Sequence, residues 1–265
     1  MKTIIFLLIA ILPVYLIGLY VYKKDKDKES RKLLTKLFIF GIISCIPTVI
    51  LELLVGSFFG PEENMSLFTM FFYVFVSIAF IEELCKWFFV YKIAYNHHEF
   101  DHIYDAVVYS VFVSLGFAAF ENILYIFQGN LTTALLRAVS AIPGHACFAI
   151  AMGNYLGIAK MNYFNNNLAL EKKNLRLSII IPTILHGLYD YCLFSESIFL
   201  LIVFLLVLIG IYIYGVKTVK KISKVPDNFI NNREVIHIFN YCPKCGSKSI
   251  GKFCFKCGNN LSSNK

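Results

Sequence analysis

Seven long apolar segments, separated by polar stretches, dominate the first 216 residues of the chain. They cover about residues 4–22, 37–59, 67–91, 103–127, 133–159, 178–194 and 198–216. Each is long enough to cross a bilayer as a helix, and in lipid a helix satisfies the backbone hydrogen bonds of its own segment. The pattern therefore predicts an all-α polytopic membrane protein with about seven transmembrane helices.

Lysine and arginine are unevenly distributed between the loops. The stretches after the first, third, fifth and seventh segments are basic, whereas residues 60–64 and 128–130 contain neither Lys nor Arg. Because cytoplasmic loops carry an excess of basic residues, we expect a multi-pass protein of the cell membrane with its N-terminus outside and its C-terminus cytoplasmic. The basic cluster follows the first segment, which argues against a cleavable signal peptide.

The composition agrees with a membrane location. Of 265 residues, 58% are hydrophobic and 16% are charged, and the mean hydropathy is +0.66, well above that of soluble domains. We assign the net charge of +8 to loops that set the topology, so no nucleic-acid partner is expected. The abundance of Lys, Ile, Asn and Phe suggests an AT-rich bacterial genome.

Several ionisable residues interrupt the apolar segments, although a charge at the bilayer centre costs about 3 kcal/mol even on lenient scales. They are Glu52, Glu82, Glu83, Lys86, Glu121, Arg137, His145, His186 and Asp190. Glu52 and Arg137 are near the outer ends of their segments, where Arg137 can extend to the interface, and we leave both out of the predicted site. The others point to a functional site inside the membrane.

Two adjacent carboxylates share one lysine in the third segment. On a helix, Glu82 is four residues and Glu83 three residues from Lys86, so both can pair with its ammonium group. A buried salt bridge that only fixes helix packing is the structural alternative. One lysine neutralises only one of the two carboxylates. We therefore favour the interpretation that the other carboxylate acts as a general base.

Three later segments carry further polar groups. Glu121 and Asn122 are adjacent in the fourth segment, Pro143-Gly144-His145 is placed in the middle of the fifth, and His186 is one turn from Asp190 in the sixth. A carboxylate at that spacing can orient an imidazole. Glu121 is expected ~24 Å from the cytoplasmic end of its helix and Glu82 ~15 Å, so a tilt, a kink at Gly116 or different boundaries must bring them together.

The order of these motifs resembles the PrsW family of intramembrane proteases, which is related to the type II CAAX prenyl endopeptidases. The resemblance is strongest over residues 40–195. It rests on four motifs, which are Glu82-Glu83-x-x-Lys86, Asp101 to Asp105 leading to Phe117-x-x-x-Glu121-Asn122, Pro143-Gly144-His145 with Gly153 and Gly157, and His186-Gly187-x-x-Asp190. The usual family form has a proline and a glycine where this chain has His102 and Ala106.

The resemblance implies hydrolysis of a peptide bond in a membrane-anchored protein, such as an anti-sigma factor, within the lipid bilayer. It points to Glu82 and Glu83 as catalytic acids, with Glu121, His145 and His186 completing the site. Lys86 and Asp190 join the predicted catalytic residues through their helical spacing, and Asn122 joins them as the amide beside Glu121.

Two mechanisms are compatible with this set. In one, His145, His186 and a carboxylate such as Glu121 ligate a catalytic zinc, and a second glutamate acts as base. In the other, Glu82 activates water without a metal, and His186, Asp190 or Asn122 stabilises the oxyanion. The sequence leaves both open and leans slightly to the metal-free form.

The C-terminal part has a different pattern. Two Cys-x-x-Cys pairs, Cys242 with Cys245 and Cys254 with Cys257, are each followed by glycine, a spacing typical of a structural zinc ribbon. Two disulfides are the alternative, which a cytoplasmic location disfavours. Because all four ligand positions of such a zinc ion are filled by cysteine, we expect the ribbon to serve contact or regulation, for instance by binding a cytoplasmic protein partner, and not catalysis.

The resulting domain prediction is a membrane protease domain at 1–222, a linker at 223–240 and a zinc ribbon at 241–262. A transporter or proton-coupled channel is the first alternative, since acids and histidines in membranes also form proton relays. A non-catalytic membrane sensor that docks a partner through the ribbon is the second.

Overall fold

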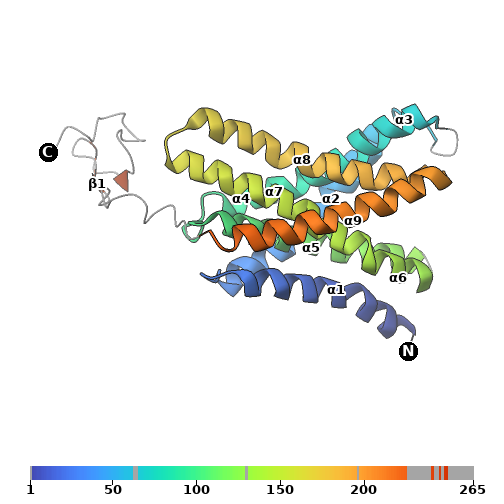
Figure 1. Cartoon of the computed structure of the whole chain (residues 1–265), viewed down its shortest axis with the longest axis horizontal. Helices are drawn as coiled ribbons and strands as arrows, with labels where there is room; N and C mark the ends of the chain where they lie inside the picture. Colours follow the sequence, from blue (N-terminus) through green and yellow to red (C-terminus); the bar gives the residue numbers. More distant parts are fainter. Residues whose placement is uncertain are drawn as a thin grey trace. The chain divides into compact units, whose positions relative to one another are not determined.

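The computed structural model of the chain describes residues 2–61, 65–128, 131–195 and 197–225, together with residues 240, 241, 245, 248 and 249. Contacts divide the chain into one unit from Met1 to Pro226 and another from Asp227 to Lys265. The first unit is a bundle of long helices that lie side by side (Figure 1). Of the second, the structure describes β1 (Asn240–Tyr241), which pairs in antiparallel fashion with β2 (Lys248–Ser249).

The helices of the first unit follow the predicted order of segments. They are α1 (Lys2–Lys24), α2 (Arg31–Gly56), α3 (Leu67–Phe72), the π-helix η2 (Tyr73–Phe80), α4 (Ile81–Ala94), α5 (Ile103–Gln128), α6 (Leu131–Val139), α7 (Ala141–Phe164), α8 (Leu168–Phe194) and α9 (Ile198–Ile222). Six helical segments of the described part of the chain are long and apolar enough to cross a membrane. The first predicted segment is also helical, over 23 residues, and the predicted helical membrane architecture is confirmed.

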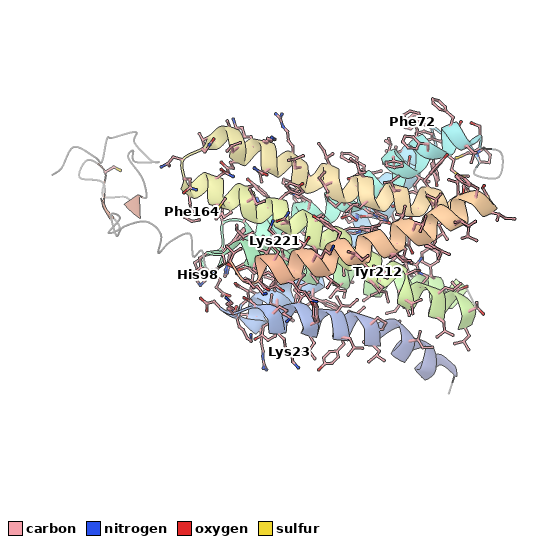
Figure 2. The ribbon with its side chains drawn as sticks, in the orientation of Figure 1. Lys23, Phe72, His98, Phe164, Tyr212 and Lys221 are labelled. Atoms are coloured by element: carbon pink, nitrogen blue, oxygen red, sulfur yellow. The ribbon has the colours of Figure 1, made fainter. Side chains whose placement is uncertain are left out.

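Consecutive spans run in opposite directions along the bundle. The C-terminal ends of four helices, α1, α4, α7 and α9, gather at one end of the bundle. They are marked in Figure 2 by Lys23, His98, Phe164 and Lys221, and Phe72 lies at the opposite end. We call the end with Lys23 and Lys221 the basic end. Predicted boundaries differ most at the basic end, where α2 and α8 begin six and ten residues earlier than expected.

The core lies along α5 and α7, which the other helices surround. On α5, Val107, Val108, Val111 and Val113 have no exposed surface, whereas Leu206 on α9 is 66% exposed. Apolar side chains that face outward on the surrounding helices are the surface expected to contact lipid.

Glycines let α5 approach its neighbours closely. A Cβ atom at Gly116 would overlap the backbone carbonyl of Phe38 on α2, and one at Gly41 would overlap that of Val113 on α5. At Gly153 on α7, a Cβ would lie 2.5 Å from the carbonyl oxygen of Ala106. These contacts set the spacing of α2, α5 and α7.

Two irregularities in the helices position the residues predicted for the site. The third span contains the π-helix η2 directly before Ile81, and π-helical turns often occur at functional sites. The fifth span is not one helix: it breaks at Ser140, so Pro143 lies in the first turn of α7 instead of mid-span. Proline is tolerated there because the first turn needs no intrahelical N–H donor.

The start of α5 is held by the Asp101 to Asp105 motif. Asp105 Oδ2 accepts hydrogen bonds from the backbone N–H groups of Asp101 at 2.9 Å and His102 at 2.6 Å. Tyr104 donates to the backbone oxygen of Val21 on α1 at 2.9 Å. The motif therefore joins the beginning of α5 to the end of α1, and it needs no proline at residue 102 to do so.

Three buried carboxyl groups meet beside this motif. Asp25, Glu29 and Asp105 each have an oxygen within 4.8 Å of the others, and Glu29 accepts a hydrogen bond of 2.5 Å from Tyr109. Burial, with the nearby Asp105 carboxylate second, raises the pKa of Glu29 to about 10. Burial raises the pKa of Asp25 to about 6. The folded protein is therefore most stable when the carboxyl groups of Asp25 and Glu29, in the linker between α1 and α2, are protonated.

Substituting the close-contact glycines tests the packing of α2 against α5. Gly41→Ala and Gly116→Ala should each lower the free energy of unfolding by about 1 to 3 kcal/mol, because the added methyl group meets backbone. Gly210→Ala is the control, since a Cβ there meets nothing within 4 Å and alanine favours a helix by about 0.5 to 1 kcal/mol. Unfolding of the detergent-solubilised chain measures the differences, and equal effects at the three positions would contradict this packing.

The raised pKa of Asp25 predicts a dependence of stability on pH. The folded carboxyl group keeps its proton up to about pH 6, whereas the unfolded one loses it near 3.8. Its contribution to stability is therefore complete below the lower value and is lost as the pH rises through the upper one. When the free energy of unfolding is measured between the two pH values, Asp25→Asn should reduce its decline with rising pH. Asp27→Asn, at an exposed position of the same linker, should leave that decline unchanged. An unchanged decline in Asp25→Asn would refute the assignment.

Candidate active site

The two predicted acids and their lysine form a buried ion cluster at the start of α4. Lys86 Nζ lies 2.9 Å from Glu82 Oε2 and 2.8 Å from Glu83 Oε1. Glu83 and Lys86 have no exposed surface, and Glu82 is 6% exposed. The ammonium group also lies 4.1 Å from the ring centroid of Phe117 on α5. The predicted pairing of both carboxylates with Lys86 is confirmed.

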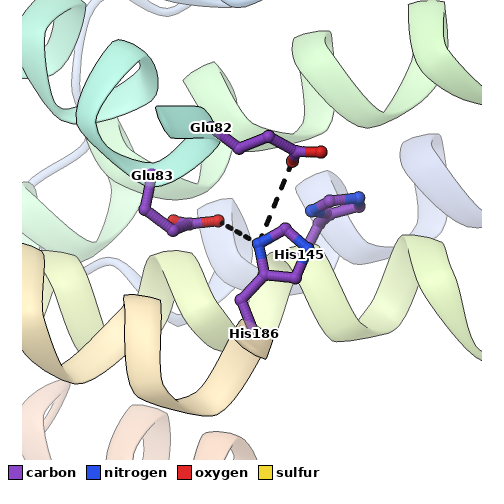
Figure 3. A group of neighbouring side chains, drawn as sticks. All are labelled: Glu82, Glu83, His145 and His186. Carbon is purple, nitrogen blue, oxygen red and sulfur yellow. Dashed lines mark hydrogen bonds and ion pairs between the residues drawn. The ribbon is translucent and has the colours of Figure 1, made fainter. Parts of the chain in front are cut away.

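His186 on α8 faces both glutamates. Its Nδ1 is 3.0 Å from Glu83 Oε1 and 3.9 Å from Glu82 Oε2, the two contacts drawn in Figure 3. Its Nε2 is 3.1 Å from Asp190 Oδ2, as their spacing of one turn predicted. The ring of Phe148 stacks on the imidazole with centroids 4.8 Å apart, so the ring is fixed by carboxylates at its edges and an aromatic face.

His145 on α7 occupies the other side of the ion cluster. Its Nδ1 is 3.2 Å from Lys86 Nζ and its Nε2 is 2.9 Å from Glu121 Oε2. The backbone oxygen of His145 accepts a hydrogen bond from Ser114 on α5 at 3.0 Å. The rings of His145 and His186 lie with centroids 5.2 Å apart, so the two histidines belong to one site (Figure 3).

Glu121 reaches the site through His145, which answers the question of its depth. The structure needs no direct contact between Glu121 and Glu82, because His145 spans the space between Glu121 and Lys86.

Arg137 belongs to this group, contrary to the expectation that it reaches the membrane interface. Its guanidinium nitrogen lies 2.9 Å from Glu121 Oε1, and its Nε donates to Asn122 Oδ1 at 3.1 Å. The side chain is 19% exposed. The sequence analysis left Arg137 out because it is near the outer end of its segment, from which a long side chain can reach the interface. The signal available was its position in the next segment, 16 residues beyond Glu121.

Glu52, which the sequence also placed outside the site, is on α2 with its Oε1 buried and without a hydrogen-bond partner. The remaining predicted residues converge. One ligand atom from each of Glu82, Glu83, His145 and His186 lies within 4.8 Å of the others, and all four residues are buried.

The chemistry of this group fits a divalent metal ion. Carboxylate oxygen and imidazole nitrogen are the donors that catalytic zinc takes, and each imidazole has a carboxylate at its other nitrogen, as metal-bound histidines usually do. Glu83 Oε2 is buried without a hydrogen-bond partner. Four acids, Glu82, Glu83, Glu121 and Asp190, lie around the two cations Lys86 and Arg137, so carboxylate oxygens are available to a further cation.

Buried glutamates and histidines gathered around one point in a helical membrane bundle are compatible with a hydrolase whose site lies within the membrane. Comparison with known proteins gives the family. Residues 29–215 match the PrsW-protease family, described as a "PrsW family intramembrane metalloprotease". The chain therefore belongs to the PrsW family of membrane proteases.

Curated relatives agree with this assignment. Protease PrsW of Oceanobacillus iheyensis is 39% identical over 202 residues, which cover 75% of this chain and 88% of that protein. Protease PrsW of Bacillus subtilis is 34% identical, with 78% and 90% covered, and that of Clostridioides difficile is 36% identical, with 78% and 88% covered. No solved structure matches the chain. The transporter and sensor alternatives are set aside.

Proposed function

We propose that this protease hydrolyses a peptide bond of a membrane-anchored protein at the site formed by Glu82, Glu83, His145 and His186. The observation that carries the proposal is the meeting of these donor atoms within 4.8 Å in a buried setting. A single-span substrate, such as an anti-sigma-factor-like protein, would present its peptide bond to this site from the surrounding bilayer.

Glu82 is the proposed base that takes a proton from the attacking water. It is the more exposed of the two glutamates, and Lys86 holds its Oε2 at 2.9 Å, which leaves Oε1 for the water. A base must lie within hydrogen-bond reach of the proton that it removes. Glu83 is tied to both Lys86 and His186 and is better suited to orient them.

The cations and donors around the glutamates stabilise charge on the substrate. Lys86 is a fixed ammonium group in a site with little exposed surface, and such preorganised charge counts more there than in water. His186 is held between Glu83 and Asp190, which fixes the orientation of its ring. The proton that Glu82 takes from the water can pass to the leaving amine. Asn122 can donate a hydrogen bond to the developing oxyanion.

A divalent metal ion is part of the proposal, since the family is described as metalloproteases and the donor set fits one. His145, His186 and a glutamate would hold it, and when bound it would lower the pKa of water and polarise the peptide carbonyl. This replaces the slight preference for a metal-free mechanism drawn from the sequence. The carboxylates of Asp190 and Glu121 would then orient the two ligating imidazoles.

The C-terminal segment is proposed to be a structural zinc ribbon that contacts a cytoplasmic partner. Of its four cysteines the structure describes Cys245, which is exposed; Cys242, Cys254 and Cys257 lie outside the described residues. Support comes from the spacing of the cysteines. The proposed boundaries are a protease domain at 1–222, a linker at 223–240 and the ribbon at 241–262.

The proposed orientation has the basic end of the bundle in the cytoplasm and the N-terminus outside. Lys23 and Lys221 gather at that end (Figure 2), and cytoplasmic ends of membrane helices are rich in such residues. In that arrangement the C-terminal exit of α9 also lies in the cytoplasm.

Cleavage by the purified protein in liposomes tests the proposed activity. With a single-span membrane protein as substrate, Glu82→Gln and His186→Ala should each lower the cleavage rate by at least about 100-fold, since each removes a group that acts on the reacting atoms. Arg176→Gln, at an exposed position of α8, is the control for handling and reconstitution. Rates equal to wild type in both site variants would refute the assignment.

Zinc content distinguishes the two proposed metal sites. The full chain should bind about two zinc ions, and the double variant Cys254→Ser, Cys257→Ser should retain about one. Adding His186→Ala should remove the remaining ion. Atomic absorption on dialysed protein measures the ratio, and one ion that survives both sets of substitutions would place the metal elsewhere.

A further inference from the structure

Arg137 is held by three different contacts around its guanidinium group. One nitrogen pairs with Glu121 Oε1 at 2.9 Å, Nε donates to Asn122 Oδ1 at 3.1 Å, and Cζ lies 3.8 Å from the ring centroid of Tyr125. All three partners are on α5, whereas Arg137 is on α6. The planar fork of arginine can satisfy two such acceptors at once, which an ammonium group cannot do in the same geometry.

The contact with Glu121 determines which nitrogen of His145 carries the proton. With Oε1 held by Arg137, Oε2 faces His145 Nε2 at 2.9 Å, and a carboxylate oxygen accepts. On the other side, His145 Nδ1 is 3.2 Å from Lys86 Nζ, and an ammonium group only donates. His145 therefore carries hydrogen on Nε2 and presents the Nδ1 lone pair toward the centre of the site.

The contact with Asn122 fixes the direction of its amide. Because Arg137 Nε can only donate, the atom facing it must be the carboxamide oxygen, and the NH₂ group must point the other way. Asn122 has no exposed surface, and its Nδ2 is buried without a hydrogen-bond partner. A buried donor left open is costly, and it suits a site whose partner arrives with the substrate.

We propose that Arg137 is a positioning residue of the protease: it sets the Nε2–H form of His145 through Glu121 and turns the Asn122 amide toward the carbonyl oxygen of the bound peptide. This inference rests on the proposed function. It gives Arg137 a task that its charge alone would not fulfil, since both partners must be held by one rigid fork.

Two substitutions separate the geometry of Arg137 from its charge. Arg137→Gln removes the charge, and Arg137→Lys keeps it but cannot hold Glu121 and Asn122 together. Both should lower kcat by about 10- to 100-fold, the usual effect of losing a residue that orients a site group, with KM within about twofold. Arg176→Lys and Arg176→Gln, at an exposed position on α8, are the matched controls.

The outcome decides between positioning and other roles. Wild-type kcat in Arg137→Lys would show that charge alone suffices and would overturn the proposal. A loss of folded protein, followed by the Tm, with wild-type kcat in the remaining fraction would show that Arg137 only supports the fold and would overturn it as well.

A second readout is independent of proteolysis. In ¹⁵N spectra of histidine-labelled protein freed of zinc with a chelator, with His145 assigned by His145→Gln, wild type should show the Nε2–H form and Arg137→Gln should gain the Nδ1–H form. An unchanged spectrum in Arg137→Gln would overturn the proposal. If wild type cleaves no membrane protein at all, the proposed function fails while this spectrum still decides the role of Arg137.

Discussion

The ion cluster of Lys86 with Glu82 and Glu83 is the constraint on which the rest of the site depends. Charges this deep in an apolar bundle are tolerated only when they are paired and hydrogen-bonded. Lys86 neutralises one charge of the pair, and the second is met by contacts that other helices supply. His186 comes from α8 and His145 from α7, so satisfying the cluster on α4 requires that these helices pack at one depth.

The backbone makes that packing available. Glycines at the crossings of α2, α5 and α7 bring the helix axes close, and a small residue in lipid allows the van der Waals contact that replaces the hydrophobic effect between helices. The break at Ser140 then divides the fifth span into two helices, each of which carries one residue of the site. The turn of α7 that follows it carries His145, and α6 before it carries Arg137, which reaches back to Glu121.

A chain of hydrogen bonds results that runs from Arg137 through Glu121 and His145 to Lys86, and on through Glu83 and His186 to Asp190. Each imidazole lies between a group at the centre and a carboxylate on its outer side. Such a chain fixes the orientation of both imidazole rings, because each ring has a hydrogen-bond partner at both of its nitrogens.

Much of this was determined by the sequence alone. The length and spacing of the apolar segments predicted the helices, because a helix in lipid needs only its own backbone, and the spacing within one helix predicted the pairs Glu82 with Lys86 and His186 with Asp190. Only the tertiary structure decided which residues meet across helices. The depth of Glu121 relative to Glu82, the break at Ser140 and the inward course of Arg137 depend on helix crossing and on breaks within spans. The hydrophobicity pattern of a single segment does not show where helices cross or where a span breaks.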